Sequence, residues 1–130
     1  MRFDSNDRSQ GEMPEQYAPH FQGTARFQFF ESPFEPGPAI FAVHFEAGAR
    51  TKPHMHHTGQ LLYVTEGEGI VATQEGRRTV RPGDVVTVGH DEWHWHGGTP
   101  DSPMTHLTVQ MPGSDDVVWD VDERDWATGY

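Results

Sequence analysis

Residues 48–60 read GARTKPHMHHTGQ. His54 and His56 stand two positions apart on an expected strand, so both imidazoles leave the same face, with their Cβ atoms roughly 6–7 Å apart. That spacing lets two rings reach one ion. Gln60 opens the next expected strand after a tight turn and can return a carbonyl oxygen to the same ion. A third imidazole must come from elsewhere, and the run HWH at 94–96 is the expected donor.

The chain on either side of this stretch has the pattern of short strands. Runs rich in Val, Thr, Phe, Trp and Tyr, most of them alternating, are separated by turns that contain Gly and Pro. Such runs are typical of strands rather than helices. Many short strands joined by regular turns predict an antiparallel sandwich or barrel. The expected strands are 25–30, 40–46, 52–57, 60–65, 69–74, 77–80, 84–88, 92–96 and 105–111.

Length and punctuation predict one domain preceded by an arm. A chain of 130 residues is the size of a single domain. Residues 1–20 are polar and contain proline breakers, so we expect a flexible N-terminal arm followed by a single domain over 21–130. Residues 113–130 are rich in carboxylates, which indicates a solvated acidic face. The pattern over 122–127 predicts a short C-terminal helix.

Charge and composition exclude several classes of protein. Nine Lys and Arg against 20 Asp and Glu give a formal net charge of −11, and Lys52 is the one lysine. Nucleic acids and anionic membranes require clustered cations, so neither is an expected partner. The lack of cysteine excludes disulfides, zinc–thiolate sites and a cysteine nucleophile. No apolar run approaches the roughly 20 residues of a membrane span, and the start has no signal-peptide pattern. We therefore expect a soluble, cytoplasmic protein.

Alternation along the strands separates two faces. We expect Phe41, Val43 and Phe45 to point inward and His44, between them, to lie outside. Three further sets are each expected to share a face: Gln60 with Leu62 and Val64, His94 with His96, and His106 with Thr108 and Gln110.

The remaining histidines and aromatic residues have simpler expected places. Trp93 and Trp95 are expected to pack in the barrel, because an aromatic stripe is most often core. Apolar side chains on outward faces favour a partner surface, and we expect a homodimer or a higher homo-oligomer. The outward apolar residues are Leu61, Tyr63 and Ile70; the histidines expected at the surface or in turns are His20, His44, His57 and His90.

Two stretches resemble the two motifs of the cupin superfamily. The first motif is a glycine, five residues, His-x-His, three residues, a carboxylate, six residues and a glycine. Its spacing is matched by Gly48, His54, His56, position 60 and Gly67. The second motif, a glycine, a short strand, a turn and a histidine, is matched by PGD at 82–84 and DEWH at 91–94. The resemblance implies an all-β fold, the double-stranded β-helix or jelly-roll barrel, with a divalent metal in its mouth and usually in a homodimer.

The chain departs from the cupin pattern where Gln60 replaces the usual glutamate. In this respect, in length, and in the runs EWHWHG at 92–97 and MTHL at 104–107, it is similar to the small manganese-dependent cupin hydroxynitrile lyases. This resemblance implies that the pocket is lined by His106 and His96 as catalytic residues. It also implies a ligand set made of His54, His56, Gln60 and His94.

The expected ligands bear on the ion and its chemistry. Three neutral imidazoles and a neutral amide would leave the full +2 charge on a metal, which favours anionic ligands such as alkoxide or cyanide. Such ligation suits manganese, iron, cobalt or nickel, and zinc less selectively, and the resemblance favours manganese. The nearby charge would lower the pKa of His96 and His106, so both would be neutral near pH 7 and able to accept a proton.

These residues predict a metal-dependent lyase that acts on a small molecule, most concretely one that splits a cyanohydrin into an aldehyde and cyanide. His106, alone or with His96, would take the hydroxyl proton. Apolar walls would suit a small aromatic or aliphatic substrate, with a hydrogen bond from an amide. The expected wall residues are Phe41, Val43, Leu62 and Gln110.

Two other functions use the same features. One is an Fe(II) cupin dioxygenase acting on a small organic substrate. The other is a small-molecule-binding module without catalysis. A cupin sugar isomerase fits less well, because the expected strands offer few basic residues for a phosphate.

Overall fold

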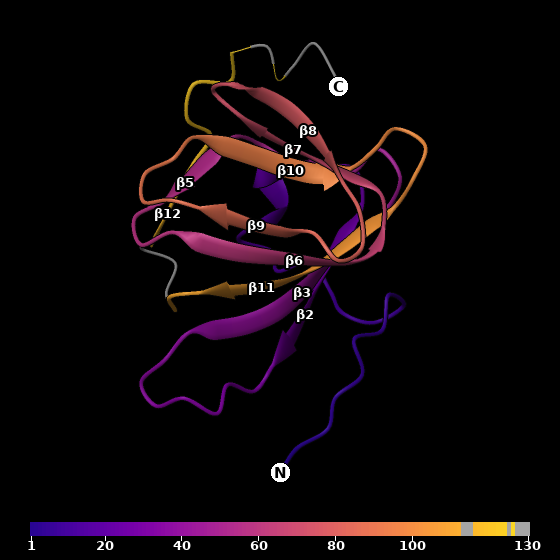
Figure 1. The fold of residues 1–130 in the computed structure, drawn as a ribbon, viewed down its shortest axis with the longest axis vertical. Helices are drawn as coiled ribbons and strands as arrows, with labels where there is room; N and C mark the ends of the chain where they lie inside the picture. Colours follow the sequence, from indigo (N-terminus) through magenta and orange to yellow (C-terminus); the bar gives the residue numbers. More distant parts are fainter. Residues whose placement is uncertain (113–115, 125, 127–130) are drawn as a thin grey trace.

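Two antiparallel sheets curl around a common interior in the computed structural model, which describes residues 1–112, 116–124 and 126 (Figure 1). One sheet has the strand order β2-β3-β11-β6-β9. Its strands are β2 (Ala25–Phe30), β3 (Ala39–Phe45), β6 (Gln60–Gly67), β9 (Val85–Val88) and β11 (Met104–Gln110).

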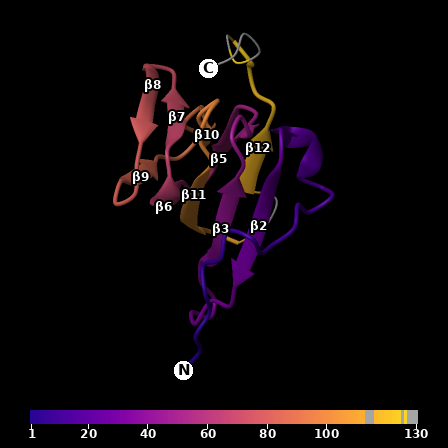
Figure 2. The ribbon, with the colours of Figure 1, turned by 90° about the vertical axis from the view of Figure 1, so that its right-hand side faces the viewer.

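The second sheet has the order β1-β4-β10-β5-β12, and β7 joins it by pairing with both β10 and β8. Figure 2 shows β7 and β8 as a hairpin at one edge of the barrel. The strands are β1 (Phe21–Gln22), β4 (Arg50–Thr51), β5 (His54–His56), β7 (Gly69–Thr73), β8 (Gly76–Val80), β10 (His94–Gly98) and β12 (Val117–Trp119). A 3₁₀ turn, η1 (Ala18–His20), precedes β1. The expected double-stranded β-helix is confirmed.

All nine expected strands are present, and their ends shift by a few residues at most. The expected strand over 52–57 is shorter, because only His54–His56 pair as β5, while residues 50 and 51 form the separate strand β4. Three strands, β1, β4 and β12, are not predicted by the sequence. The expected helix over 122–127 falls partly on residues 125 and 127, which lie outside the described part of the chain. Within that part, no helix has the length and hydropathy needed to cross a membrane.

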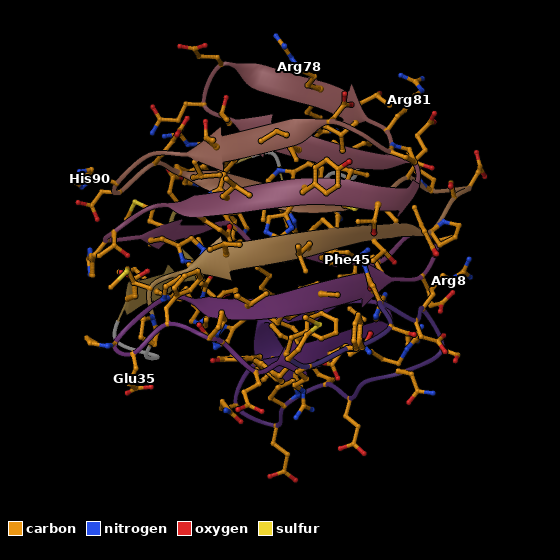
Figure 3. The ribbon with its side chains drawn as sticks, turned by 60° about the horizontal axis from the view of Figure 1, so that its bottom comes forward. Arg8, Glu35, Phe45, Arg78, Arg81 and His90 are labelled. Carbon is orange, nitrogen blue, oxygen red and sulfur yellow. The ribbon has the colours of Figure 1, made fainter. Side chains whose placement is uncertain are left out.

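The main core fills the space between the sheets with the inward set that alternation predicts. Phe41, Val43 and Phe45 of β3 are all at most 5% exposed and pack with Val64 and Met104 from the neighbouring strands. Figure 3 places Phe45 inside the molecule and the charged Arg8, Arg78 and Arg81 at its periphery. The interior therefore provides a rigid apolar frame around whatever polar groups the strands direct inward.

A second, smaller core lies against the other face of β10. Trp93 and Trp95 pack there with Trp126 and Ala72, and the partly buried Ile70 rests on this cluster. Both tryptophans are thus packed as expected. The expectation of an outward apolar residue holds for Leu61 and Tyr63, which are exposed, whereas Ile70 is partly buried against this cluster.

His44 corrects the expectation that it lies at the surface. Its side chain does leave the outer face of β3, but it is only 1% exposed. One ring nitrogen lies 2.9 Å from Oγ1 of Thr105 and the other lies 3.0 Å from Oε1 of Gln28. Gln28 in turn donates to the carbonyl of Ser5, so the N-terminal residues cover this part of the sheet.

Part of the N-terminal segment packs on the barrel. Glu12 pairs with Phe27 of β2 through two backbone hydrogen bonds of 3.1 and 2.8 Å. Met13 and Tyr17 are partly buried against the main core. This packing brings Tyr17 beside the interior, where it contributes to the site below.

Candidate metal centre

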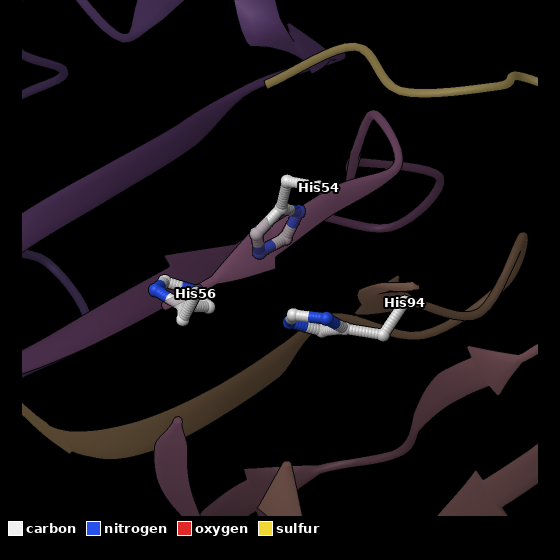
Figure 4. A group of neighbouring side chains, drawn as sticks. All are labelled: His54, His56 and His94. Carbon is white, nitrogen blue, oxygen red and sulfur yellow. The ribbon is translucent and has the colours of Figure 1, made fainter. Parts of the chain in front are cut away.

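Strands β5 and β10 bring three histidines together. His54 and His56 alternate on β5, so their rings leave the same face, and the antiparallel register pairs His54 with His94 of β10. One ring nitrogen from each residue lies within 4.8 Å of the others, and all three side chains are at most 3% exposed. Figure 4 shows the rings gathered in the interior, two from one strand and the third from the other.

Backbone carbonyls fix the orientation of two of these rings. Nδ1 of His54 donates to the carbonyl of Lys52 at 2.9 Å, and Nδ1 of His94 donates to the carbonyl of Glu92 at 2.9 Å. A carbonyl only accepts, so the hydrogen is on Nδ1 and the lone pair is on Nε2. Nε2 of His94 is buried with no hydrogen-bond partner among the described residues. Both rings therefore present an unprotonated nitrogen of the kind that binds a cation.

His56 has a different neighbour. No backbone carbonyl accepts from its ring, and both of its ring nitrogens are buried without a hydrogen-bond partner in the described residues. Oδ2 of Asp116 lies 3.5 Å from Nδ1. Asp116 is itself 8% exposed. The sequence gives no sign of this contact, because Asp116 belongs to the acidic segment that its composition assigns to a solvated face.

Gln60 offers an oxygen to the same region. Its Nε2 donates to Oε1 of Gln110 at 2.8 Å, the residue that faces it across the β6–β11 pair. Its Oε1 is buried and has no partner among the described residues. The hydrogen bond to Gln110 thus fixes which end of the amide is the free acceptor, and Gln60 lines the same cavity as His54 and His56.

Burial keeps the three histidines neutral. Burial lowers the pKa of His54 well below its ordinary value, and the neighbouring His94 and His56 rings lower it further. Burial lowers the pKa of His94 to about 4. Burial also lowers the pKa of His56, although the Asp116 carboxylate acts in the opposite direction. Neutral imidazole is the form that ligates metals, so the buried unpaired nitrogens and the amide oxygen fit a divalent cation.

Two further histidines form a buried pair beside this group. Nδ1 of His96 lies 3.0 Å from Nε2 of His106, whose Nδ1 lies 2.9 Å from Oγ1 of Thr108. Burial lowers the pKa of His96 well below the ordinary value, with a contribution from His106, and burial lowers the pKa of His106 to about 3. Nε2 of His96 has no partner in the described residues. His96 lines the cavity, whereas His106 is 0% exposed and lies behind it.

A cavity of about 330 Å³ opens beside these side chains. Of the expected wall residues, Phe41, Val43 and Gln110 line it, and Leu62 is buried but not part of the lining. Five further lining residues are aromatic, and several of them come from segments without a predicted strand. These additional aromatic lining residues are Tyr17, Phe21, Phe27, Phe29 and Trp119.

Trp119 stands between the cavity and the surface. Its ring lies 4.8 Å from that of His54, measured between centroids. On its other side His20 stacks at 4.7 Å with nearly parallel planes, and Nδ1 of His20 lies 2.7 Å from Oδ2 of Asp120. His20 is thus half-buried rather than free at the surface, while His57 and His90 are exposed as expected.

Comparison with known proteins gives relatives with this architecture. The chain is 44% identical over 95 residues to the (R)-mandelonitrile lyase of Granulicella tundricola, a match that covers 69% of this chain and 70% of that protein. A cupin-like protein of Thermotoga maritima superposes with a TM-score of 0.73 at 27% identity, covering 86% of this chain and 89% of that one. The polyketide cyclase RemF of Streptomyces resistomycificus shares the fold, with a TM-score of 0.74 at 17% identity, covering 98% of this chain and 94% of that one.

A family model for the cupin domain matches the segment of the chain that holds the candidate site. The cupin domain model matches residues 41–110, which run from β3 through β11 and include every histidine described above except His20. That match spans more than half of the chain, and the barrel it predicts is the one that the strand pairing builds. The chain belongs to the cupin family.

Proposed function

We propose that the chain is a divalent-metal-dependent lyase that cleaves cyanohydrins, or forms them in reverse. The observation that carries this proposal is His96, whose Nε2 has no partner in the described residues and which lines the same cavity as His54, His56 and Gln60. A proton acceptor and a cation site would thus face one small molecule. The 44% identity to a relative named (R)-mandelonitrile lyase supports the same reaction.

The residues that would hold the cation are His54, His56 and His94, with the amide oxygen of Gln60. A bound divalent ion would supply Lewis acidity toward the hydroxyl oxygen or toward cyanide. We propose manganese as the ion because of the resemblance to the manganese-dependent cupin hydroxynitrile lyases. A neutral set of imidazole and amide donors without a thiolate also suits iron, cobalt, nickel and zinc, which are the alternatives.

His96 is the residue placed to take the hydroxyl proton. In cleavage, that proton passes to its Nε2, the O–H electron pair becomes the second bond of the aldehyde carbonyl, and the carbon–carbon bond breaks. Cyanide leaves with the electrons of that bond and recovers the proton as hydrogen cyanide. For Nε2 of His96 to accept, its Nδ1 must carry the hydrogen and donate it to Nε2 of His106, which lies 3.0 Å away and so holds the ring in one orientation. Burial lowers the pKa of both rings, so both are neutral near pH 7.

The cavity walls suit an uncharged aromatic substrate. None of the residues that line the cavity in the described part of the chain carries a formal charge other than through histidine. Phe41, Phe29 and Trp119 line the cavity, and aromatic rings pack well against an aryl group. A charged substrate would lose its hydration there without gaining a partner.

The test is cleavage of mandelonitrile by the purified protein, with elemental analysis of the same preparation. Parallel samples would hold manganese, iron, zinc or no metal after chelation. We expect benzaldehyde and cyanide release that requires a metal and is greatest with manganese. Oxygen uptake with Fe(II) and no cyanide release would instead favour a dioxygenase, and ligand binding without turnover under any metal would favour a binding module.

Two adjacent histidines give a matched control for the metal requirement. His56 faces the interior, whereas His57 is exposed and pairs with Asp91 at 2.7 Å. We expect His56→Ala to lose both metal and cleavage, and His57→Ala to keep both. Equal metal content in the two variants would contradict the proposed ligand set.

A further inference from the structure

Asp116 is a buried carboxylate beside one member of the histidine group. The residue directly precedes β12, and its side chain is among the few charged groups in the described chain that are nearly removed from solvent, at 8% exposure. An ionised carboxylate is retained in such a place only where partners compensate its lost hydration. One of its oxygens has such partners and the other does not.

The two oxygens of Asp116 have different surroundings. Oδ1 accepts from the backbone N–H of Thr58 at 3.0 Å and from its hydroxyl at 2.7 Å. Oδ2 has no hydrogen-bond partner in the described residues and lies 3.5 Å from Nδ1 of His56, which also has none. Two unpartnered buried atoms of complementary chemistry therefore face each other, and a small movement of the ring would join them.

The backbone holds this pair in register. The N–H of His57 donates to the carbonyl of Asp116 at 2.8 Å, and the next residue, Val117, pairs with His56. Strand β12 thus fixes the carboxylate at the edge of β5, the strand that carries two histidines of the group. This arrangement limits which way the side chain of Asp116 can point.

We propose that Asp116 is the positioning residue for His56: it accepts the hydrogen of Nδ1 and leaves Nε2 free to ligate the cation. The carbonyls of Lys52 and Glu92 accept the Nδ1 hydrogens of His54 and His94 in the same way, and no carbonyl among the described residues does so for His56. Carboxylates in this role fix the orientation of a ligating imidazole and raise its basicity.

The proposal also changes the charge of the centre. Neutral ligands including Gln60 would leave the full +2 charge of the ion uncompensated. Asp116 supplies one negative charge from behind His56, where it lowers the net charge without occupying a ligand position. The negative charge that a glutamate at position 60 would bring as a ligand is then supplied by Asp116, which contacts a ligand rather than the ion. This inference rests on the metal site of the proposed function and not on the reaction.

The experiment compares Asp116→Asn with Asp91→Asn. An asparagine amide can keep the bond from Thr58 through its oxygen, but its NH₂ group then faces His56 and favours hydrogen on Nε2, the wrong nitrogen. We expect Mn²⁺ to bind 10–100-fold more weakly to Asp116→Asn, measured by competition with a chelator of known affinity. Asp91→Asn removes the exposed carboxylate that pairs with His57, so it matches the change in charge, and we expect parent affinity.

Unfolding of the metal-free proteins separates positioning from simple loss of structure. We expect metal-free Asp116→Asn to unfold at a temperature equal to or above that of the parent, because a buried carboxylate is removed. Parent affinity in Asp116→Asn, or the same loss in Asp91→Asn, would overturn the proposal. A parent that binds Mn²⁺ tightly but does not cleave mandelonitrile would overturn the proposed reaction and leave this inference standing.

A measurement on the parent protein needs no variant. In the Zn²⁺-loaded protein, long-range ¹H–¹⁵N spectra of the imidazoles report which nitrogen carries hydrogen. We expect His56 to be protonated at Nδ1 with Nε2 bound to the metal, as for His54 and His94. Metal on Nδ1 of His56 would refute the assignment even if the Asp116 variants failed to fold.

Discussion

Each of three interior histidines has its Nδ1 held by a neighbouring group, which leaves Nε2 as the nitrogen that can act on a ligand. His54 and His94 are held by backbone carbonyls, and His96 is held by His106. The local hydrogen bond thus sets the direction in which each ring can act. The pKa of each of these three rings is lowered, so each is neutral near pH 7. Only the position of a ring therefore separates the proposed metal ligands, His54 and His94, from the proposed base, His96.

His96→Ala and His106→Ala are expected to differ in the size of their effect on catalysis. His96 lines the cavity, so its loss should lower kcat by about 10²–10⁴-fold while metal content is unchanged. His106 acts through His96, so its loss should lower kcat less. The measurements are initial rates and elemental analysis, with His90→Ala, an exposed position, as the control (Figure 3). A larger effect for His106→Ala, or full activity in both, would remove His96 from the proton transfer.

At the scale of strands and turns, the site depends on a few close approaches of the backbone. β6 ends at Gly67, where φ is +74° and an added Cβ would lie 1.9 Å from the carbonyl oxygen of Pro103. Gly48, before β4, has nearly the same φ of +78° but has nothing within 4 Å of an added Cβ. Two glycines of the first sequence motif are therefore required for different reasons.

This pair gives a prediction about stability. Gly48→Ala should cost about 1–2 kcal/mol from the left-handed backbone conformation alone. Gly67→Ala should cost the same and about 1–3 kcal/mol more, because the chain must shift away from Pro103. Urea unfolding of both variants in the metal-free state measures the difference. Equal destabilisation of Gly48→Ala and Gly67→Ala would mean that the backbone after β6 moves away from Pro103 at little cost in free energy.

Element length also decides what the sequence could predict. Strands of four or more residues were recognised by alternation, because each carries its own pattern of inward residues. β1, β4 and β12 have two or three residues and exist because a distant strand pairs with them, such as β12 with β5. Asp116 and Trp119 enter the site with β12, so no local pattern predicts the place of either in the site. His44 was misplaced for a related reason, since the cover over it comes from residues at the start of the chain.

At the scale of the whole molecule, the six buried histidines of the described chain make stability depend on pH. The pKa of His94 falls to about 4 and that of His106 to about 3 on folding, from an ordinary value near 6.5. Between those values the unfolded chain binds protons that the folded chain does not. Stability therefore rises with pH in this window, and is lost as pH falls from 6.5 toward 4.

The metal-free protein is expected to be less stable at pH 5 than at pH 7. Each of these two histidines contributes about 1.4 kcal/mol per pH unit below 6.5, so together they amount to about 4 kcal/mol at pH 5. Denaturant unfolding at both pH values, in the presence of a chelator, measures this loss. A free energy of unfolding that does not change between pH 7 and pH 5 would show that the histidines are charged or hydrated in the folded chain.

Trp119 lies between the rings of His20 and His54, and this position makes its indole an optical probe. The ring centroid of Trp119 lies 4.8 Å from that of His54. The other three tryptophans, Trp93, Trp95 and Trp126, belong to the cluster on the other face of β10. A paramagnetic ion quenches fluorescence steeply with distance, so filling the site should dim the emission of one tryptophan in four. The fluorescence of unlabelled protein would then measure how much of the site holds metal. In Trp119→Phe, adding the metal should no longer lower the emission in this way.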